Sequence, residues 1–87
     1  MLTERMKLIL SNGKSVALNR DKSLWLALYN GKYYMVNTNS GELSELEGHE
    51  AVALAYKSPK FEECQKLFNF SKKDIDRVVE AWGGRWK

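Results

Sequence analysis

The fold is decided by residues 24–37, which read LWLALYNGKYYMVN. Two runs rich in aromatic and aliphatic side chains, Leu24–Tyr29 and Lys32–Asn37, flank the pair Asn30-Gly31. An Asn-Gly pair is the strongest short-range signal for a two-residue hairpin turn, because both residues tolerate a positive φ angle. The segment therefore predicts two antiparallel strands that meet at this turn.

Both faces of this predicted hairpin are apolar. With a two-residue loop, residues at equal distance from the turn face each other, and successive side chains alternate between the two faces. A sheet with two apolar faces needs cover on both. We therefore expect helices on one face and a partner or a second copy of the chain on the other, where it would meet Trp25, Tyr34 and Val36. One face holds the pairs Leu28–Tyr33 and Leu26–Met35, and the other holds Ala27–Tyr34 and Trp25–Val36.

The same pattern extends to both sides of the central hairpin. A second Asn-Gly pair, Asn12-Gly13, separates residues 7–10 from residues 15–18 and predicts a first hairpin there. After a turn at residues 37–41, residues 42–46 add a short last strand. Residues 1–46 are thus predicted to form an antiparallel β meander of three to five strands with two Asn-Gly hairpins.

After Gly48 the periodicity of the apolar residues changes from two to that of a helix. The spacing predicts three short C-terminal helices over residues 47–82: the first ends before Pro59, the second is capped by Ser58 and ends at Asn69, and the third is capped by Ser71. The fold class is therefore α+β, in one domain over residues 1–87, with a flexible tail at residues 83–87. The inner face of the third helix is predicted to carry Ile75, Val78, Val79 and Trp82.

Composition narrows the classes of function. The single Cys64 excludes an internal disulfide, and no apolar run is long enough to cross a membrane, so we expect a cytoplasmic protein without membrane contact. One cysteine and one histidine, His49, supply neither a zinc set nor a catalytic constellation, and no Gly-rich phosphate loop is present. We therefore expect a non-enzymatic binding protein with no cofactor, metal or small-molecule substrate.

The charges are unevenly distributed, although the net charge is only +3. Residues 1–41 carry six bases and two acids, residues 42–63 carry six glutamates and two lysines, and residues 71–87 carry five bases and three acids. The basic ends favour a polyanion through electrostatic steering, whereas the Glu-rich middle is a candidate surface for a protein partner.

Residues 64–78, within the two helices predicted over residues 61–82, resemble a helix-turn-helix DNA-binding motif. Asn69 stands at the turn position and Phe70 at the apolar position after it, although Gln65 replaces the small residue that the family has where its two helices cross. The resemblance implies a transcriptional regulator that binds duplex DNA. It places four side chains of the third helix against the DNA: Lys72, Lys73, Asp76 and Arg77.

One alternative class stays open beside the DNA-binding interpretation. The basic residues of the third helix are also what an ordinary solvated helix face contains, and the chain would then be a protein-interaction module, such as a homodimer or a small phage-type inhibitor. The C-terminal Arg85, Trp86 and Lys87 serve either class, because the two cations can follow a phosphate backbone and the indole can anchor in a protein groove.

Overall fold

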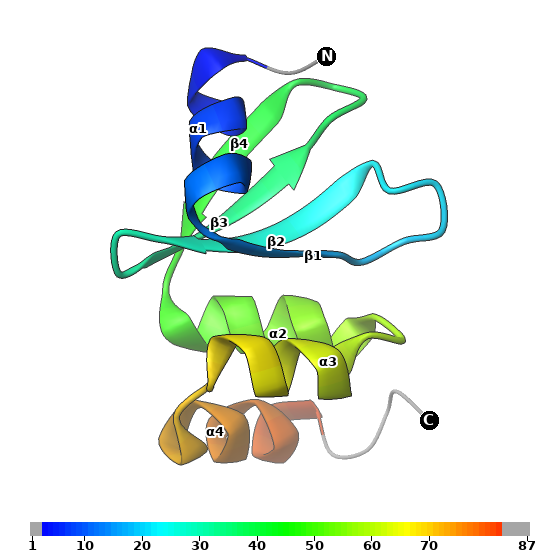
Figure 1. The fold of residues 1–87 in the computed structure, drawn as a ribbon. Helices are drawn as coiled ribbons and strands as arrows, with labels where there is room; N and C mark the ends of the chain where they lie inside the picture. The colour runs from blue at the N-terminus through cyan, green and yellow to red at the C-terminus, as the bar shows by residue number, and fades with distance from the viewer. Residues whose placement is uncertain (1–2, 83–87) are drawn as a thin grey trace.

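A computed structural model describes residues 3–82 of the chain, except the side chain of Trp82. Its centre is a four-stranded antiparallel sheet whose strands are neighbours in chain order. One helix lies on one face of the sheet and the other helices lie beyond the opposite face (Figure 1). The predicted α+β fold is confirmed, and an N-terminal helix adds to it. The elements are α1 (Glu4–Asn12), β1 (Lys14–Ala17), β2 (Leu24–Tyr29), β3 (Lys32–Asn37), β4 (Glu42–Leu46), α2 (Gly48–Lys57), α3 (Phe61–Phe68) and α4 (Lys72–Trp82).

The central hairpin has the predicted bounds and register. Leu28 pairs with Tyr33 and Leu26 with Met35 across β2 and β3. Both turn residues are left-handed, with φ angles of 56° at Asn30 and 79° at Gly31. The last strand, β4, also forms as predicted and pairs antiparallel with β3.

The first Asn-Gly hairpin was predicted wrongly, because residues 4–12 form helix α1. Thr3 caps this helix by accepting a hydrogen bond from the backbone N–H of Met6 at 3.2 Å. Met6 and Ile9 fall three residues apart on its buried side. Gly13 has a φ of −100°, so this Asn-Gly pair does not form the positive-φ turn on which the hairpin signal depends.

Helix α1 covers the sheet face for which we expected a partner. Its Ile9 forms a buried cluster with Ala27 of β2 and Tyr34 of β3, and Leu43 of β4 packs against them. The guanidinium of Arg5 lies 5.8 Å from the centre of the Tyr34 ring. The chain thus covers its own second sheet face, so no second subunit is needed to bury it.

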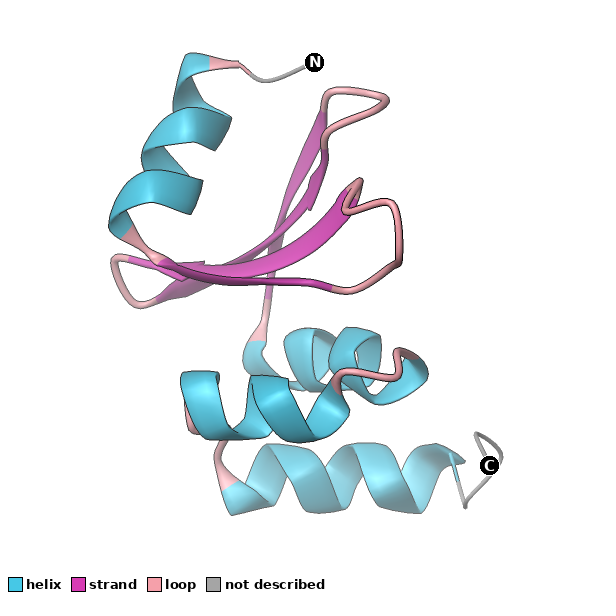
Figure 2. Cartoon of the chain, turned by 45° about the vertical axis from the view of Figure 1, so that its right-hand side comes forward, coloured by secondary structure: helices cyan, strands magenta, loops and turns pink. Residues whose placement is uncertain are grey.

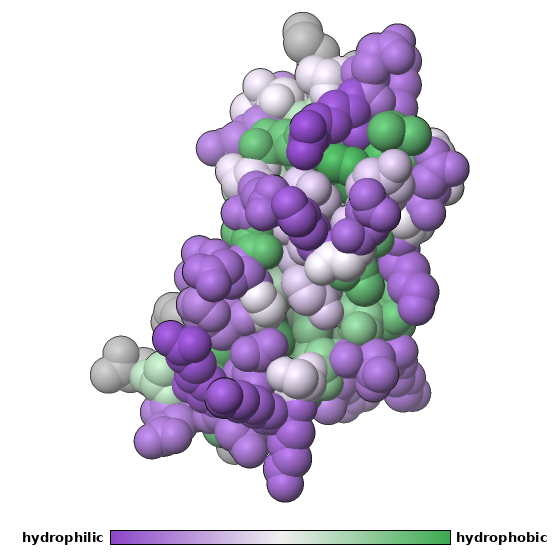
Figure 3. Space-filling model, turned by 90° about the vertical axis from the view of Figure 1, so that its left-hand side faces the viewer, coloured by the Kyte–Doolittle hydropathy of each residue, from purple (hydrophilic) through white to green (hydrophobic). Residues whose placement is uncertain are grey.

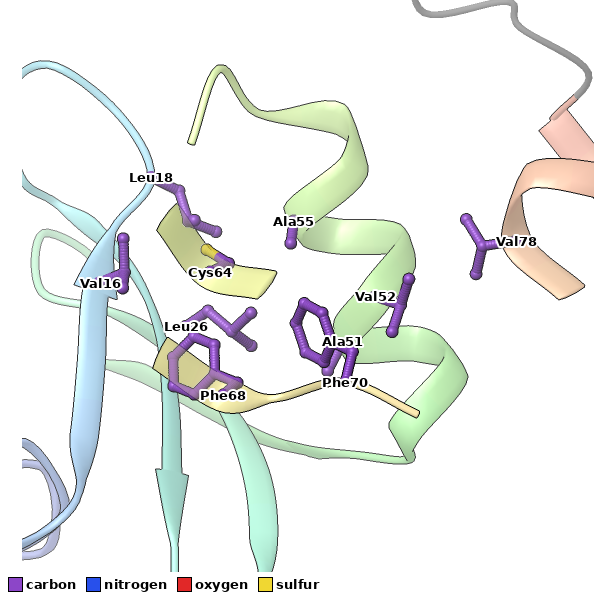
Figure 4. Close-up of a cluster of buried hydrophobic side chains, with 10 residues drawn as sticks. All are labelled: Val16, Leu18, Leu26, Ala51, Val52, Ala55, Cys64, Phe68, Phe70 and Val78. Atoms are coloured by element: carbon purple, nitrogen blue, oxygen red, sulfur yellow. The ribbon is translucent and has the colours of Figure 1, made fainter. Parts of the chain in front are cut away.

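The larger core lies between the sheet and the C-terminal helices (Figure 4). The ring of Tyr33 packs edge-on against Phe68 at 6.0 Å and also contacts Phe70 at 5.8 Å. In Figure 4, Val78 of α4 points toward Val52 on the side of α2 that faces away from the strands. The buried residues of this core are Val16, Leu18, Leu26, Ala51, Val52, Ala55, Cys64, Phe68, Phe70 and Val78.

The helices begin and end at identifiable residues. Glu47 and Glu50 form a capping box at the start of α2, where the N–H of Glu47 donates to Glu50 Oε1 at 2.8 Å. Ser58 does not cap α3 as predicted. It ends α2 instead, and its hydroxyl donates to Ala55 O at 2.8 Å, because α3 begins two residues later than predicted with Lys60 as its N-cap.

The C-terminal helices form two layers beneath the sheet (Figures 1 and 2). Helices α2 and α3 lie next to the strands, and α4 lies beyond them and packs chiefly against α2. Helix α4 is therefore the outermost layer of the molecule on this side. Its position leaves most of its surface open to a ligand.

Candidate functional site

A tight turn positions α4. Asn69 ends α3 in the left-handed conformation, with φ 53° and ψ 55°, and its N–H donates to Gln65 O at 3.0 Å. The next residue, Phe70, is buried in the core. Ser71 then accepts a hydrogen bond from the N–H of Asp74 at 3.2 Å and starts α4. The predicted helix terminator at Asn69 and the predicted helix cap at Ser71 are thus confirmed.

The two sides of α4 differ in chemistry. Val78 is buried and Ile75 half-buried against the core, whereas Val79 is 41% exposed. Val79 was predicted on the inner face, but α4 contacts little besides α2, so only a narrow stripe of the helix is covered. Trp82 was also placed on that face, and its side chain lies outside the described residues. The exposed side carries Lys72, Lys73, Asp76, Arg77 and Glu80.

The exposed side of α4 presents three cations that form no ion pair with another described residue. The ion pair found among the described residues joins Lys32 and Glu45, far from α4 in the sequence, so Lys72, Lys73 and Arg77 pair with no carboxylate of residues 3–81. Asp74, the nearest acid in the first turn, is directed to Gly48 of α2, where a Cβ would lie 2.5 Å from its carboxylate oxygen. The three cations therefore remain available to an external anion.

Helices α3 and α4 are the two helices of the expected motif, and the turn at Asn69 joins them. The two helices run in roughly opposite directions in both views (Figures 1 and 2). Gln65, which replaces the small residue of the motif, is exposed. The helix-turn-helix resemblance stays a prediction. A binding experiment can test it at the exposed side of α4.

The predicted partner-binding residues lie in different surroundings. Tyr34 and Val36 are buried, with exposed fractions of 5% and 0%, and Ile9 of α1 packs against Tyr34, so neither residue offers an exposed surface to a partner. Trp25 is half-buried, and its indole N–H donates to Lys22 O at 2.6 Å. Arg85, Trp86 and Lys87, and the tail of which they are part, lie outside the described residues.

A second surface was not predicted. A groove of about 420 Å³ runs along β1 and continues to the start of α3. Three cations from separate segments line it, Arg20 and Lys22 of the β1–β2 loop and Lys60 at the N-cap of α3, together with Trp25 and Glu63. No local pattern connects residues 20–25 with residues 60–63, so only the packing of α3 against β1 brings them together.

Cys64 is poorly placed to act as a nucleophile. Cys64 has an exposed fraction of 0%, and burial, with a smaller contribution from Glu63, raises the pKa of its thiol to about 11. A thiolate is therefore scarce at neutral pH. No cluster of three metal-ligating side chains occurs in the described part of the chain.

Comparison with known proteins identifies no relative of this chain. No family model matches the chain, and no curated protein or solved structure matches it significantly. None of the helices between residues 3 and 82 is long and apolar enough to cross a membrane. On the face drawn in Figure 3, hydrophilic side chains form most of the outer surface and apolar ones lie recessed between them.

Proposed function

We propose that this chain is a small, non-enzymatic, cytoplasmic DNA-binding domain that contacts duplex DNA with the exposed side of α4. One observation carries the proposal: the outermost helix exposes Lys72, Lys73 and Arg77 without a carboxylate partner in the described residues, while Ile75 and Val78 hold its other side on the core. Contacts from cations to phosphate oxygens provide most of the affinity of such a domain and fix its position on the duplex.

The acids beside these cations define what kind of binding to expect. Asp76 and Glu80 share the exposed side of α4, so the local charge is +1 and not the strongly basic stripe of a non-specific DNA binder. An acid in the groove repels phosphates but accepts hydrogen bonds from cytosine amino groups. Asp76 is therefore assigned a discriminating role, and Lys72, Lys73 and Arg77 an attractive one.

The test removes the three cations together by Lys72→Gln, Lys73→Gln and Arg77→Gln. None of the three is buried, so each change should alter the free energy of unfolding by no more than about 0.5 kcal/mol. The affinity for labelled genomic DNA fragments should fall far more than about tenfold, and the slope of log affinity against log salt should flatten by up to about three units. Fluorescence anisotropy at two salt concentrations measures both quantities.

The matched control removes three cations elsewhere, by Arg20→Gln, Lys22→Gln and Lys60→Gln. Both triple variants lower the net charge by three, so a difference between them reports position and not total charge. We expect the control to keep most of the DNA affinity. Equal losses in the two variants, or wild-type affinity no tighter than that of any basic protein of this size, would count against α4 as the DNA-binding element.

A further inference from the structure

The outer edge of β1 is an unpaired strand edge. The N–H of Leu18 donates to Leu24 O of β2 at 2.8 Å, which identifies Leu18 as a residue whose backbone groups point to β2. Because this direction alternates along an antiparallel strand, Val16 also points to β2, whereas Ser15 and Ala17 point away from it. No described residue forms a hydrogen bond to these outward N–H and C=O groups.

The groove lies along this same edge. Its lining includes the consecutive residues 15–18, and consecutive residues of a strand line one cavity only where the cavity follows the strand edge, because their side chains alternate between faces. Residues 14–17 span about 13 Å at the usual rise, enough for four residues of an added strand. A volume of about 420 Å³ is within the range of ligand pockets.

The charges around the groove determine which kind of peptide strand can bind at this edge. Arg20, Lys22 and Lys60 are exposed around the groove, they pair with no described carboxylate, and Glu63 is the one acid in the groove lining. The groove-lining residues therefore carry a net charge of +2. Arg20 and Lys22 lie at one end of β1, and Lys60 lies alongside it. An incoming strand with acidic side chains is attracted to the groove, and a basic strand is repelled.

The loop that carries two of these cations is held in place. Asn19 Oδ1 accepts hydrogen bonds from the N–H groups of Ser23 at 3.0 Å and Leu24 at 3.1 Å, and Ser23 donates from its hydroxyl to Asp21 at 2.7 Å. Lys22 has a left-handed φ of 60°, and its carbonyl accepts from Trp25. The cations are thus presented by an ordered loop beside the strand edge.

We propose that the β1 edge is a second binding site, which takes an extended, acidic peptide segment of a partner protein as an added β-strand. Ser15 and Ala17 supply the backbone hydrogen bonds to the segment, and Arg20, Lys22 and Lys60 select acidic side chains. Strand addition obtains affinity from the main chain and specificity from the groove walls. The site is separate from the DNA-binding side of α4 and does not depend on it.

The experiment selects binders from a phage-displayed library of random nonapeptides against the wild-type chain. The expected consensus is extended and carries Asp or Glu at alternate positions. On saturation with a synthetic consensus peptide, the amides of Ser15 and Ala17 should exchange at least about tenfold more slowly, as newly bonded amides do. Methylation of alternate backbone nitrogens of the peptide should abolish binding. Failure to select any peptide, a basic consensus, or unchanged exchange at both amides would overturn the proposal.

Two variants of the chain separate the contribution of the β1 backbone edge from that of the groove cations. Ala17→Pro removes one outward N–H without removing a bond to β2 and should abolish peptide binding. If this variant does not fold, the triple variant of Arg20, Lys22 and Lys60 to Gln keeps the edge and should weaken acidic peptides at least about tenfold. The triple variant of α4 should bind the peptide as the wild type does. A failure of the DNA-binding proposal can therefore be told apart from a failure of the peptide-binding proposal. Peptide binding that survives both groove variants contradicts the site.

Other occupants give different results, and each would overturn the proposal. A single-stranded octanucleotide of thymidine that binds more tightly than any selected peptide, without protecting Ser15 and Ala17, would identify a nucleic-acid groove. Self-association of the wild type in sedimentation, abolished by Ala17→Pro in the absence of peptide, would identify a second copy of the chain as the occupant.

Discussion

At the scale of single residues, burial determines the chemistry of Cys64. The thiol lies in the core between the sheet and α3, where desolvation disfavours its charged form and raises its pKa to about 11. The thiolate population at pH 8 is therefore much smaller than that of a solvated cysteine.

We therefore expect Cys64 to be alkylated by iodoacetamide at pH 8 at least about 100-fold more slowly in the folded chain than in guanidinium. The folded-state rate should rise as the pH approaches 11, because the thiolate then forms. Mass spectrometry of timed samples measures both rates. Similar rates in the two states would show that the thiol is accessible and would reopen a nucleophilic role.

At the scale of elements, Gly13 determines how the chain passes from α1 into β1. A Cβ at this position would meet the carbonyl oxygen of Leu28, and would lie 2.8 Å from that of Ile9. Both are backbone atoms, so a Cβ fits only if the backbone at residue 13 shifts away from Leu28 of β2 and from Ile9 of α1. The φ of −100° shows that the requirement is for space and not for a left-handed conformation.

Replacement of Gly13 by Ala should thus lower the free energy of unfolding by about 1–3 kcal/mol, as overpacked sites do. Gly41 is the matched control, because it has a φ of 78° and nothing lies within 4 Å of a Cβ there. Gly41→Asn, which tolerates the left-handed region, should cost less than about 1 kcal/mol. Urea denaturation compares the two, and equal costs would remove the steric explanation.

At the scale of the whole molecule, one sheet separates two cores. The core under α1 and the core under α2 and α3 share the strands β2 and β3, whose alternate side chains enter one or the other. Neither core can be lost without exposing an apolar face of the shared sheet. We therefore expect the described part of the chain to unfold in one cooperative step.

The variant Ile9→Ala tests this expectation. Ile9 is 1% exposed, so the change should destabilise the fold by about 2–5 kcal/mol. Far-UV circular dichroism and tryptophan fluorescence should shift to lower urea together, with an unchanged slope against urea. Two separate transitions would mean instead that α1 detaches from a sheet that stays folded.

Local chemistry predicted the central hairpin, the end of α3 at Asn69 and the start of α4 after Ser71, but not the start of α3. Asn30-Gly31 set the register of β2 and β3 because the turn geometry needs positive φ at two adjacent residues. Asn69 ended α3 because asparagine tolerates the left-handed conformation of a helix C-cap. Exposure of Lys72, Lys73 and Arg77 followed from helical periodicity and from the cap at Ser71. These features depend on residues only a few positions apart, so the sequence by itself determined them.

Tertiary packing decided the rest. Whether Asn12-Gly13 makes a hairpin or ends a helix depends on whether the stripe of Met6 and Ile9 finds an apolar sheet face to cover, and that face is built by β2 and β3. The groove beside β1 depends in the same way on α3, which brings Lys60 to Arg20 and Lys22 across some 40 residues of chain. Hydrophobic burial is non-directional, so it joins segments for which no short-range pattern exists.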